Sequence, residues 1–343
     1  MIRTRLLYTA IVRPAIVYGA QTWYTGSNGK QMKANVKQLE RIQNKCLRRI
    51  TGGYKRTPRA ALEREAKILP LDLYCDTLTM NKALHDQGSK VSEEIRATVN
   101  AIWEAENRPP QRTQRRRRNP GEGRQRPPTS SEHVLNKAIE RQMEIRGHRA
   151  RQAEREGPTR ARRPRANRAP PGRPQKEKST IDEWAELEWK RRWQQKARNR
   201  REATWKTPWE QSTLKLYSDM PKHQASALFL LRTEVIGLNG WLALINVPGI
   251  DAKCGCGWTT QTVQHVLAFC PLYTAGRADL VRRTGTKGMG RLLSTLEKVQ
   301  ATARWFVQQE ILQQFNLAKD IEEEEAGELT PFQPLEEDEQ DLP

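Results

Sequence analysis

Three cysteines and one histidine lie within residues 254–270, which read CGCGWTTQTVQHVLAFC. Cys254, Cys256, His265 and Cys270 have the spacing C-x-C-x8-H-x4-C. Zinc prefers four nitrogen or sulfur ligands in a tetrahedron, and three thiolates with one imidazole complete that shell. A filled shell leaves no position for a catalytic water. The pattern therefore predicts zinc as a cofactor, in a structural rather than a catalytic site.

The alternative is that the four residues are unrelated and that the last two only line a helix face. Gly255 and Gly257 favour the metal, because glycine allows the backbone to turn tightly around an ion. QTVQHVLAF predicts one short helix that Pro271 ends. Residues five apart on an α-helix point about 140° apart. Cys270 is therefore expected at or beyond the end of the helix that carries His265.

The chain as a whole is strongly basic. Its 60 Lys and Arg exceed its 40 Asp and Glu, which gives a net charge of +20. Binding to a polyanion releases counterions, so nucleic acid, RNA or DNA, is the expected partner, ahead of an anionic membrane. No long apolar run or signal-peptide pattern is present, so we expect a soluble protein that is nuclear or otherwise cytoplasmic, without a membrane or small-molecule partner.

The positive charge is concentrated in residues 108–178, which hold 22 Lys or Arg and 7 Asp or Glu. The segment has too few apolar residues to bury a surface that would offset its chain entropy. It is therefore predicted to be a long disordered basic linker. One part, with a helix-cap signal at Ser131, could form a charged helix. The densest runs read either as phosphate-binding arms and nuclear import signals or as plain solvated linker. The candidate nucleic-acid-binding residues are Arg115, Arg116, Arg117, Arg118, Arg160, Arg162, Arg163 and Arg165.

Apolar residues recur at helical spacing on both sides of this linker, so the fold class is predicted as mainly α. A helix should end at Gly52-Gly53, and Thr57 should cap the next one, with Pro58 at its first position. The predicted domains are a helical N-terminal domain (1–107), the linker (108–178), a small helical C-terminal domain with the zinc knuckle (179–319) and an acidic disordered tail (320–343).

Five tryptophans alternate with Lys and Arg between residues 184 and 209. They could stack on single-stranded bases. A stripe of tryptophans on a helix more often packs against a neighbouring element, and we favour that interpretation.

Several catalytic patterns are missing from the sequence. Two-metal polymerases and nucleases need clustered carboxylates, yet there is no Asp-Asp pair, and the aspartates before the tail show no grouping. Neither G-x-x-x-x-G-K-[ST] nor G-x-S-x-G occurs. The chain is not expected to be an enzyme as it stands.

Two N-terminal stretches are similar to a known family. LYTAIVRPAIVYGAQTWY (7–24) and LERIQNKCLRRITGGYKRTPRAALEREAKILPLDLY (39–74) resemble the thumb region that follows the polymerase core in reverse transcriptases of non-LTR retrotransposons, particularly the fungal type. A CCHC zinc knuckle lies near the C-terminus of the same polyproteins. PKHQASALFLLRTE (221–234) also resembles that family.

The catalytic motifs of this family cannot be placed on the chain. The paired aspartates of the polymerase palm and the carboxylate clusters of the nuclease domains are missing, and the basic linker occupies the place where an RNase H domain often sits. The resemblance thus implies a non-catalytic remnant that binds RNA or DNA. The alternatives are an accessory part of an RNA-directed DNA polymerase that needs a separate catalytic core, and a host interaction protein. The oligomeric state is not predicted.

Overall fold

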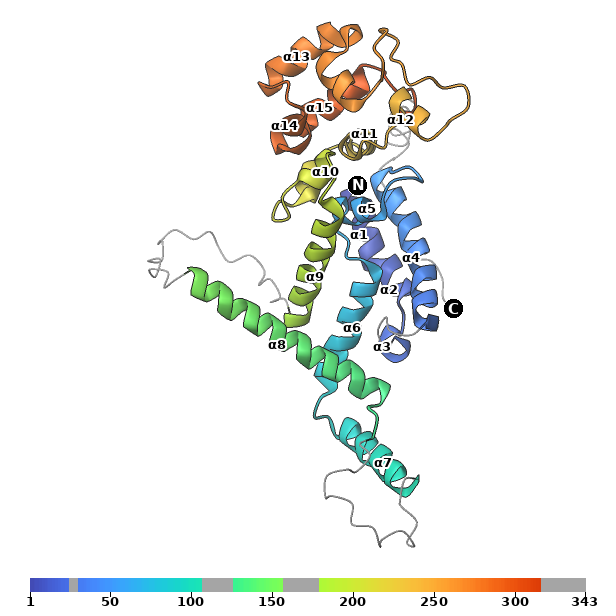
Figure 1. Ribbon diagram of the computed structural model, residues 1–343, viewed down its shortest axis with the longest axis vertical. Coiled ribbons are helices and arrows are strands. Elements are labelled where there is room, and N and C mark those ends of the chain that lie inside the picture. Colours follow the sequence, from blue (N-terminus) through green and yellow to red (C-terminus); the bar gives the residue numbers. More distant parts are fainter. Residues whose placement is uncertain (25–29, 107–125, 157–178, 316–343) are drawn as a thin grey trace, which may run out of the picture. The chain divides into compact units, whose positions relative to one another are not determined.

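The computed structural model describes residues 1–24, 30–106, 126–156 and 179–315 (Figure 1). Every regular element in these ranges is a helix, which confirms the mainly α class for the described part of the chain. The chain divides into two compact units that are discontinuous in sequence. Unit 1 comprises residues 1–9, 44–68 and 197–343, and unit 2 comprises residues 10–43 and 69–196. The domain boundaries given above stay a prediction.

Unit 2 is organised around α6, which packs against α3 and α8. Side chains of α3 and α6 share an apolar cluster that includes Ala20, Tyr24 and Leu71. A second cluster joins Met80 of α6 to Val134, Ala138 and Ile181. The helices of this unit are α2 (Arg13–Ile16), α3 (Ala20–Trp23), the first part of α4 (Lys30–Thr51), α6 (Leu71–Asp86), α7 (Lys90–Glu106), α8 (Ser130–Glu156) and α9 (Thr180–Ala197).

Two carboxylates of α6 form ion pairs with the neighbouring helices. Asp72 pairs with Arg192 of α9 at 2.6 Å, and Asp76 pairs with Lys137 of α8 at 2.9 Å. Asp76 is almost fully buried. Burial raises the pKa of Asp76. The charge of Lys137 opposes this effect but does not cancel it, so the pKa stays raised.

The long helix α8 is the charged helix that the sequence allowed within the basic linker, but its cap differs from the prediction. Thr129, not Ser131, caps it: the Glu132 N–H donates to the Thr129 hydroxyl at 3.3 Å. The Glu132 carboxylate in turn accepts from the Thr129 N–H at 2.8 Å. This reciprocal pair is a capping box. A hydrogen bond from Arg126, with those from Thr129, lowers the pKa of Glu132 to about 2.

Unit 1 contains the shorter helices. The second part of α4 ends at Thr51, and Gly52 follows with a φ of +75°. A side chain at Gly52 would also collide with Ser226 of α11, so glycine is required there for both reasons. The other elements are α1 (Ile2–Leu7), α5 (Arg59–Glu65), α10 (Ala203–Lys206), α11 (Lys222–Thr233), α12 (Asn239–Leu244), α13 (Thr274–Thr284), α14 (Met289–Ser294) and α15 (Leu296–Gln308), with single-turn helices η3 (Thr213–Tyr217), η4 (His265–Phe269) and η5 (Pro271–Tyr273); the π turn η1 (Tyr8–Val12) spans the boundary between the units.

The start of α5 also differs from the prediction. Pro58 is its N-cap, and no side chain donates or accepts a capping hydrogen bond. The hydroxyl of Thr57 is buried and has no hydrogen-bond partner among the described residues. Thr57 therefore does not cap this helix.

A buried ion pair joins α5 to α11 in the core of unit 1. Arg232 lies 2.8 Å from Glu65, and both side chains are fully buried. Tyr217 also donates a hydrogen bond to Glu65, at 2.6 Å, as does Thr204. Burial disfavours the charged carboxylate, but the Arg232 charge and these hydrogen bonds outweigh it and lower the pKa of Glu65. The segment around α5 and the segments around α10 and α11 are thus parts of one core.

Most of the tryptophans from the basic-aromatic stretch pack inside their units. Trp189, Trp193 and Trp205 are buried, as the sequence favoured. The guanidinium of Arg64 lies over the Trp209 ring, 4.7 Å from the ring centroid. Trp184 is half-buried.

Candidate metal centre

The structure brings the four predicted ligands together in unit 1. Their ligand atoms all lie within 4.8 Å of one another. The sulfurs of Cys254 and Cys270 are 3.7 Å apart, and the sulfur of Cys256 is 3.3 Å from Nε2 of His265. Two sulfurs of a tetrahedral zinc site with Zn–S bonds of about 2.3 Å lie about 3.8 Å apart. The cluster therefore has the donor set that a zinc ion would need, and these two separations are close to those of a tetrahedral zinc site.

A closed turn presents the first two cysteines. The N–H of Cys254 donates to the Trp258 carbonyl at 3.0 Å, and the N–H of Gly257 donates to the Cys254 carbonyl at 2.9 Å. Gly257 has a φ of +90°, a conformation that other residues rarely adopt. Both thiols thus project from one short loop, as the glycine pattern predicted.

The start of α12 fixes the base of this loop. The N–H of Gly240 donates to the Gln261 carbonyl at 3.1 Å, and the side-chain amide of Asn239 donates to the Lys253 carbonyl at 2.8 Å. A Cβ on Gly240 would lie only 2.7 Å from the Gln261 carbonyl oxygen. The close approach of α12 therefore depends on glycine at this position.

A π turn positions the other two ligands. Helix η4 (His265–Phe269) is a π-helix, and the N–H of Cys270 donates to the His265 carbonyl at 2.8 Å. This i to i+5 hydrogen bond brings together two residues that α-helical geometry would turn apart. Cys270 itself has extended backbone angles and lies just beyond the helix.

Arg277 of α13 supports the same turn. Its Nη2 donates to the carbonyls of Val266, at 3.3 Å, and of Cys270. The side chain is buried, so these hydrogen bonds are shielded from water. Arg277 thereby links the backbone at both ends of the π turn to the next helix.

The protonation of the cluster suits metal binding at the histidine. Burial and then the charge of Arg277 lower the pKa of His265, which keeps the imidazole in the neutral form that binds metals. Burial raises the pKa of Cys270 to about 11. For Cys256, burial acts in the same direction, but hydrogen bonds from the Trp258 N–H and the other thiols outweigh it and lower the pKa. A metal ion must displace the thiol protons to bind.

Exposed apolar side chains surround the cluster. Trp258 stacks on the His265 ring with centroids 5.5 Å apart and an interplanar angle of 9°, yet it is 58% exposed. Phe269 is 64% exposed and Leu272 60%. Leu272 also lies against Gly255, where an added Cβ would be 3.8 Å away. We call Trp258, Phe269 and Leu272 the knuckle surface.

The geometry supports a structural metal site rather than a catalytic one. Three thiols and one imidazole fill a tetrahedral shell, so a bound zinc would have no open position for water or substrate. A bound zinc would hold the loop 254–258 against η4. Segments this short cannot form a hydrophobic core of their own that would hold them together.

The candidate nucleic-acid-binding arginines lie outside the described residues. This applies to 115–118 and to 160, 162, 163 and 165 alike. The acidic tail also lies beyond them.

Sequence reasoning missed the residues that support the ligands. Arg277 is seven positions after Cys270, and no local pattern distinguishes it from the other arginines of α13. The stacking of Trp258 on His265 depends on the folded loop. The one available signal was the five-residue spacing itself, which an α-helix cannot accommodate.

Comparison with known proteins identifies no family. No protein-family model matches the chain, and neither the curated proteins nor the solved structures contain a significant match. Among the helices of the described ranges, none is long and apolar enough to cross a membrane. Fold and site together define a mainly helical protein with a Cys3His cluster that could bind a metal ion such as zinc.

Proposed function

We propose that this protein binds nucleic acid through its basic segments and a zinc-stabilised knuckle, without catalytic activity of its own. The observation that carries the proposal is the Cys3His cluster, whose ligand atoms lie within 4.8 Å of one another in a chain with a net charge of +20. A small zinc module in a chain of this charge is typical of nucleic-acid-binding proteins.

The knuckle surface gives the proposal a specific contact. Trp258 and Phe269 are exposed beside the metal cluster, where the loop and η4 hold their backbones in place. Exposed aromatic rings of this kind stack on unpaired bases. We therefore favour single-stranded RNA or DNA over a closed duplex.

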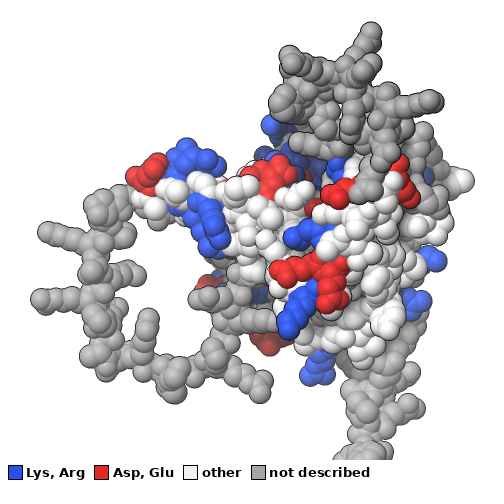
Figure 2. All heavy atoms as spheres, turned by 90° about the horizontal axis from the view of Figure 1, so that it is seen from below, with Lys and Arg blue, Asp and Glu red and all other residues white. Residues whose placement is uncertain are grey.

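In this proposal the phosphate contacts are made by the basic runs. On the face drawn in Figure 2, the described Lys and Arg lie beside Asp and Glu and form no continuous basic patch. The arginine-rich runs at 115–118 and 160–165 carry almost uncompensated charge. Their contacts with phosphates are expected to be independent of base sequence.

The resemblance to non-LTR retrotransposon reverse transcriptases supplies a biological context for the same proposal. It rests on residues 7–24, 39–74 and 221–234 together with the knuckle. In this context the chain would hold template RNA or target DNA beside a catalytic core that another chain supplies. The observation in favour is the combination of thumb-like stretches with a knuckle and without catalytic carboxylates.

Metal analysis and oligonucleotide binding test the proposal together. We expect one zinc per purified chain and binding of a single-stranded oligonucleotide that weakens steeply as salt rises from about 50 to 200 mM. Trp258→Ala should weaken binding about tenfold, since stacking contributes about 1–3 kcal/mol per base. Leu244→Ala, another exposed apolar residue of unit 1, is the matched control. Absence of zinc, or binding that is insensitive to salt and to Trp258→Ala, would overturn it.

A further inference from the structure

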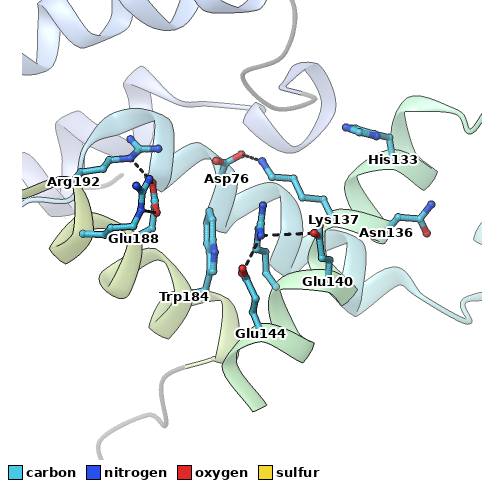
Figure 3. A pocket seen from close by; sticks show the side chains of 11 residues that line it. Asp76, His133, Asn136, Lys137, Glu140, Glu144, Trp184, Glu188 and Arg192 are labelled. Atoms are coloured by element: carbon cyan, nitrogen blue, oxygen red, sulfur yellow. Dashed lines mark hydrogen bonds and ion pairs between the residues drawn. The ribbon is translucent and has the colours of Figure 1, made fainter. Parts of the chain in front are cut away.

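Unit 2 contains a pocket of about 700 Å³ between α6, α8 and α9 (Figure 3). None of the metal-cluster residues belongs to it. Its volume lies within the range of small-molecule sites, about 300–1,000 Å³. Aromatic, cationic and carboxylate side chains line the walls, so a ligand with both a planar and a charged part would match them.

Trp184 supplies the aromatic wall. It stands between the charged side chains of α8 and those of α9 (Figure 3). Part of its ring packs against the apolar cluster that includes Ala138 and Ile181, which fixes its position. The guanidinium of Arg141 lies over the ring, 5.4 Å from its centroid. Trp184 is half-buried, so only the part of the indole that Arg141 and the apolar cluster leave open could stack on a base.

Arg141 also offers a hydrogen-bond donor. Its Nη1 donates to Glu144 at 2.9 Å. Its Nε is buried and has no hydrogen-bond partner among the described residues. A buried donor without an acceptor is destabilising. The atom is inaccessible as the side chain stands, so a ligand oxygen could satisfy it only after a shift of the Arg141 side chain.

The α9 side of the pocket offers further donors in a fixed arrangement. Glu188 accepts from Arg191 at 2.7 Å and from Arg192 at 2.8 Å, which orients both guanidinium groups. Arg191 remains 59% exposed, so its other N–H groups can reach a phosphate.

The α8 side offers acceptors. The side chain of Glu144 is 55% exposed at this edge. An ionised carboxylate accepts hydrogen bonds only, and it therefore suits the N–H groups of a base rather than a phosphate. The pocket thus has separate groups for each part of a nucleotide.

We propose that this pocket binds a single nucleotide, with the base against Trp184 and the phosphate at Arg141 and Arg191. Guanine is the expected preference, because its Watson–Crick edge presents two adjacent N–H donors to the Glu144 carboxylate. The pocket goes beyond the proposed function, since it lies in the unit without the knuckle and does not require the metal.

The test uses the full chain labelled with 5-fluorotryptophan, with the Trp184 resonance assigned through Trp184→Phe. Guanosine 5′-monophosphate should shift this ¹⁹F resonance saturably, and ribose 5-phosphate, which lacks the base, should shift it little. By calorimetry, Trp184→Leu should weaken binding about tenfold. Arg141→Lys should also weaken binding, because lysine keeps the charge but lacks the Nε donor. Arg151→Lys, at an exposed position of α8, should bind like the natural chain.

Three results would overturn the nucleotide pocket. They are no saturable shift at Trp184, an equal shift with ribose 5-phosphate, and unchanged affinity in folded Trp184→Leu and Arg141→Lys. Thermal unfolding establishes whether each variant folds. If Trp184→Leu does not fold, the affinity of Arg141→Lys decides the question. Zinc removal should leave this binding intact. Failure here and failure of the knuckle to bind oligonucleotides are therefore distinguishable.

Discussion

The N–H of Cys270 donates a hydrogen bond to the carbonyl of His265 at 2.8 Å, and this π turn brings two candidate ligands, five residues apart, into one Cys3His cluster. Single π turns are rare, because their geometry is less favourable than that of an α-helix. Those that do occur are often found at functional sites. Something must therefore stabilise the turn. In this structure Arg277 does so through the carbonyls of Val266 and Cys270.

Arg277→Ala should lower zinc affinity by about 10–100-fold, the range typical when a group that orients the ligands is removed. The reason is that the π turn loses the donor at both of its ends. Competition with a chelator measures the change. Arg283→Ala, an exposed arginine of the same helix, should have no effect. Equal zinc affinity in the two variants would show that Arg277 does not position the ligands.

Removal of the metal should destabilise unit 1 selectively. A ligand present at 1,000 times its Kd stabilises the folded state by about 4 kcal/mol, and this stabilisation is lost with a chelator or with Cys270→Ser. Cys46→Ser, a half-buried cysteine of α4 that is not part of the cluster, is the control. Hydrogen exchange should increase at 254–270 but not in α6 and α8. Unchanged exchange at 254–270 after chelation would contradict a structural metal.

The buried ion pair makes a second prediction for unit 1. Glu65→Ala leaves Arg232 as an uncompensated buried charge, which costs about 3–5 kcal/mol in free energy of unfolding. Asp279→Ala removes a carboxylate from exposed pairs with Arg282 and Arg283 and should cost less than about 1 kcal/mol. Denaturant unfolding measures both. Similar values for the two variants would mean that the Glu65 pair contributes no more than a surface pair.

The same carboxylate predicts a dependence of stability on pH. The folded state lowers the pKa of Glu65 below its unfolded value of about 4.3, so its contribution is fully present above that pH. It is lost as pH falls through the lower folded pKa, because the unfolded chain then binds the proton more readily. Glu65→Gln should therefore flatten the acid side of the stability profile below about pH 4. A profile identical to that of the natural chain would exclude Glu65 as its source.

Local patterns predicted the parts of this structure that depend on neighbours in sequence. Gly52 marked the end of α4, and the spacing of the cysteines and His265 marked the cluster. The core of unit 1 was not predictable in this way. Glu65 and Arg232 are 167 positions apart, and charged side chains are normally exposed, so their burial follows only from the tertiary fold.

The cap of α8 shows how far a local pattern can be relied upon. Ser131 and Thr129 are both good N-cap residues, and the sequence prediction named only Ser131, which was wrong. The structure places Thr129 at the cap through its reciprocal hydrogen bonds with Glu132. Arg126 pairs with the Glu132 carboxylate and so helps to hold it at this cap.

Thr129→Ala should consequently destabilise unit 2 by about 1 kcal/mol, because the Glu132 N–H loses its acceptor at the start of α8. Ser131→Ala should be neutral, although Ser131 is the residue that the sequence favoured. Hydrogen exchange of the first turn of α8 separates the two variants, with faster exchange only in Thr129→Ala. If Ser131→Ala shows the larger effect, the helix begins at Ser131, and the capping box between Thr129 and Glu132 does not form in solution.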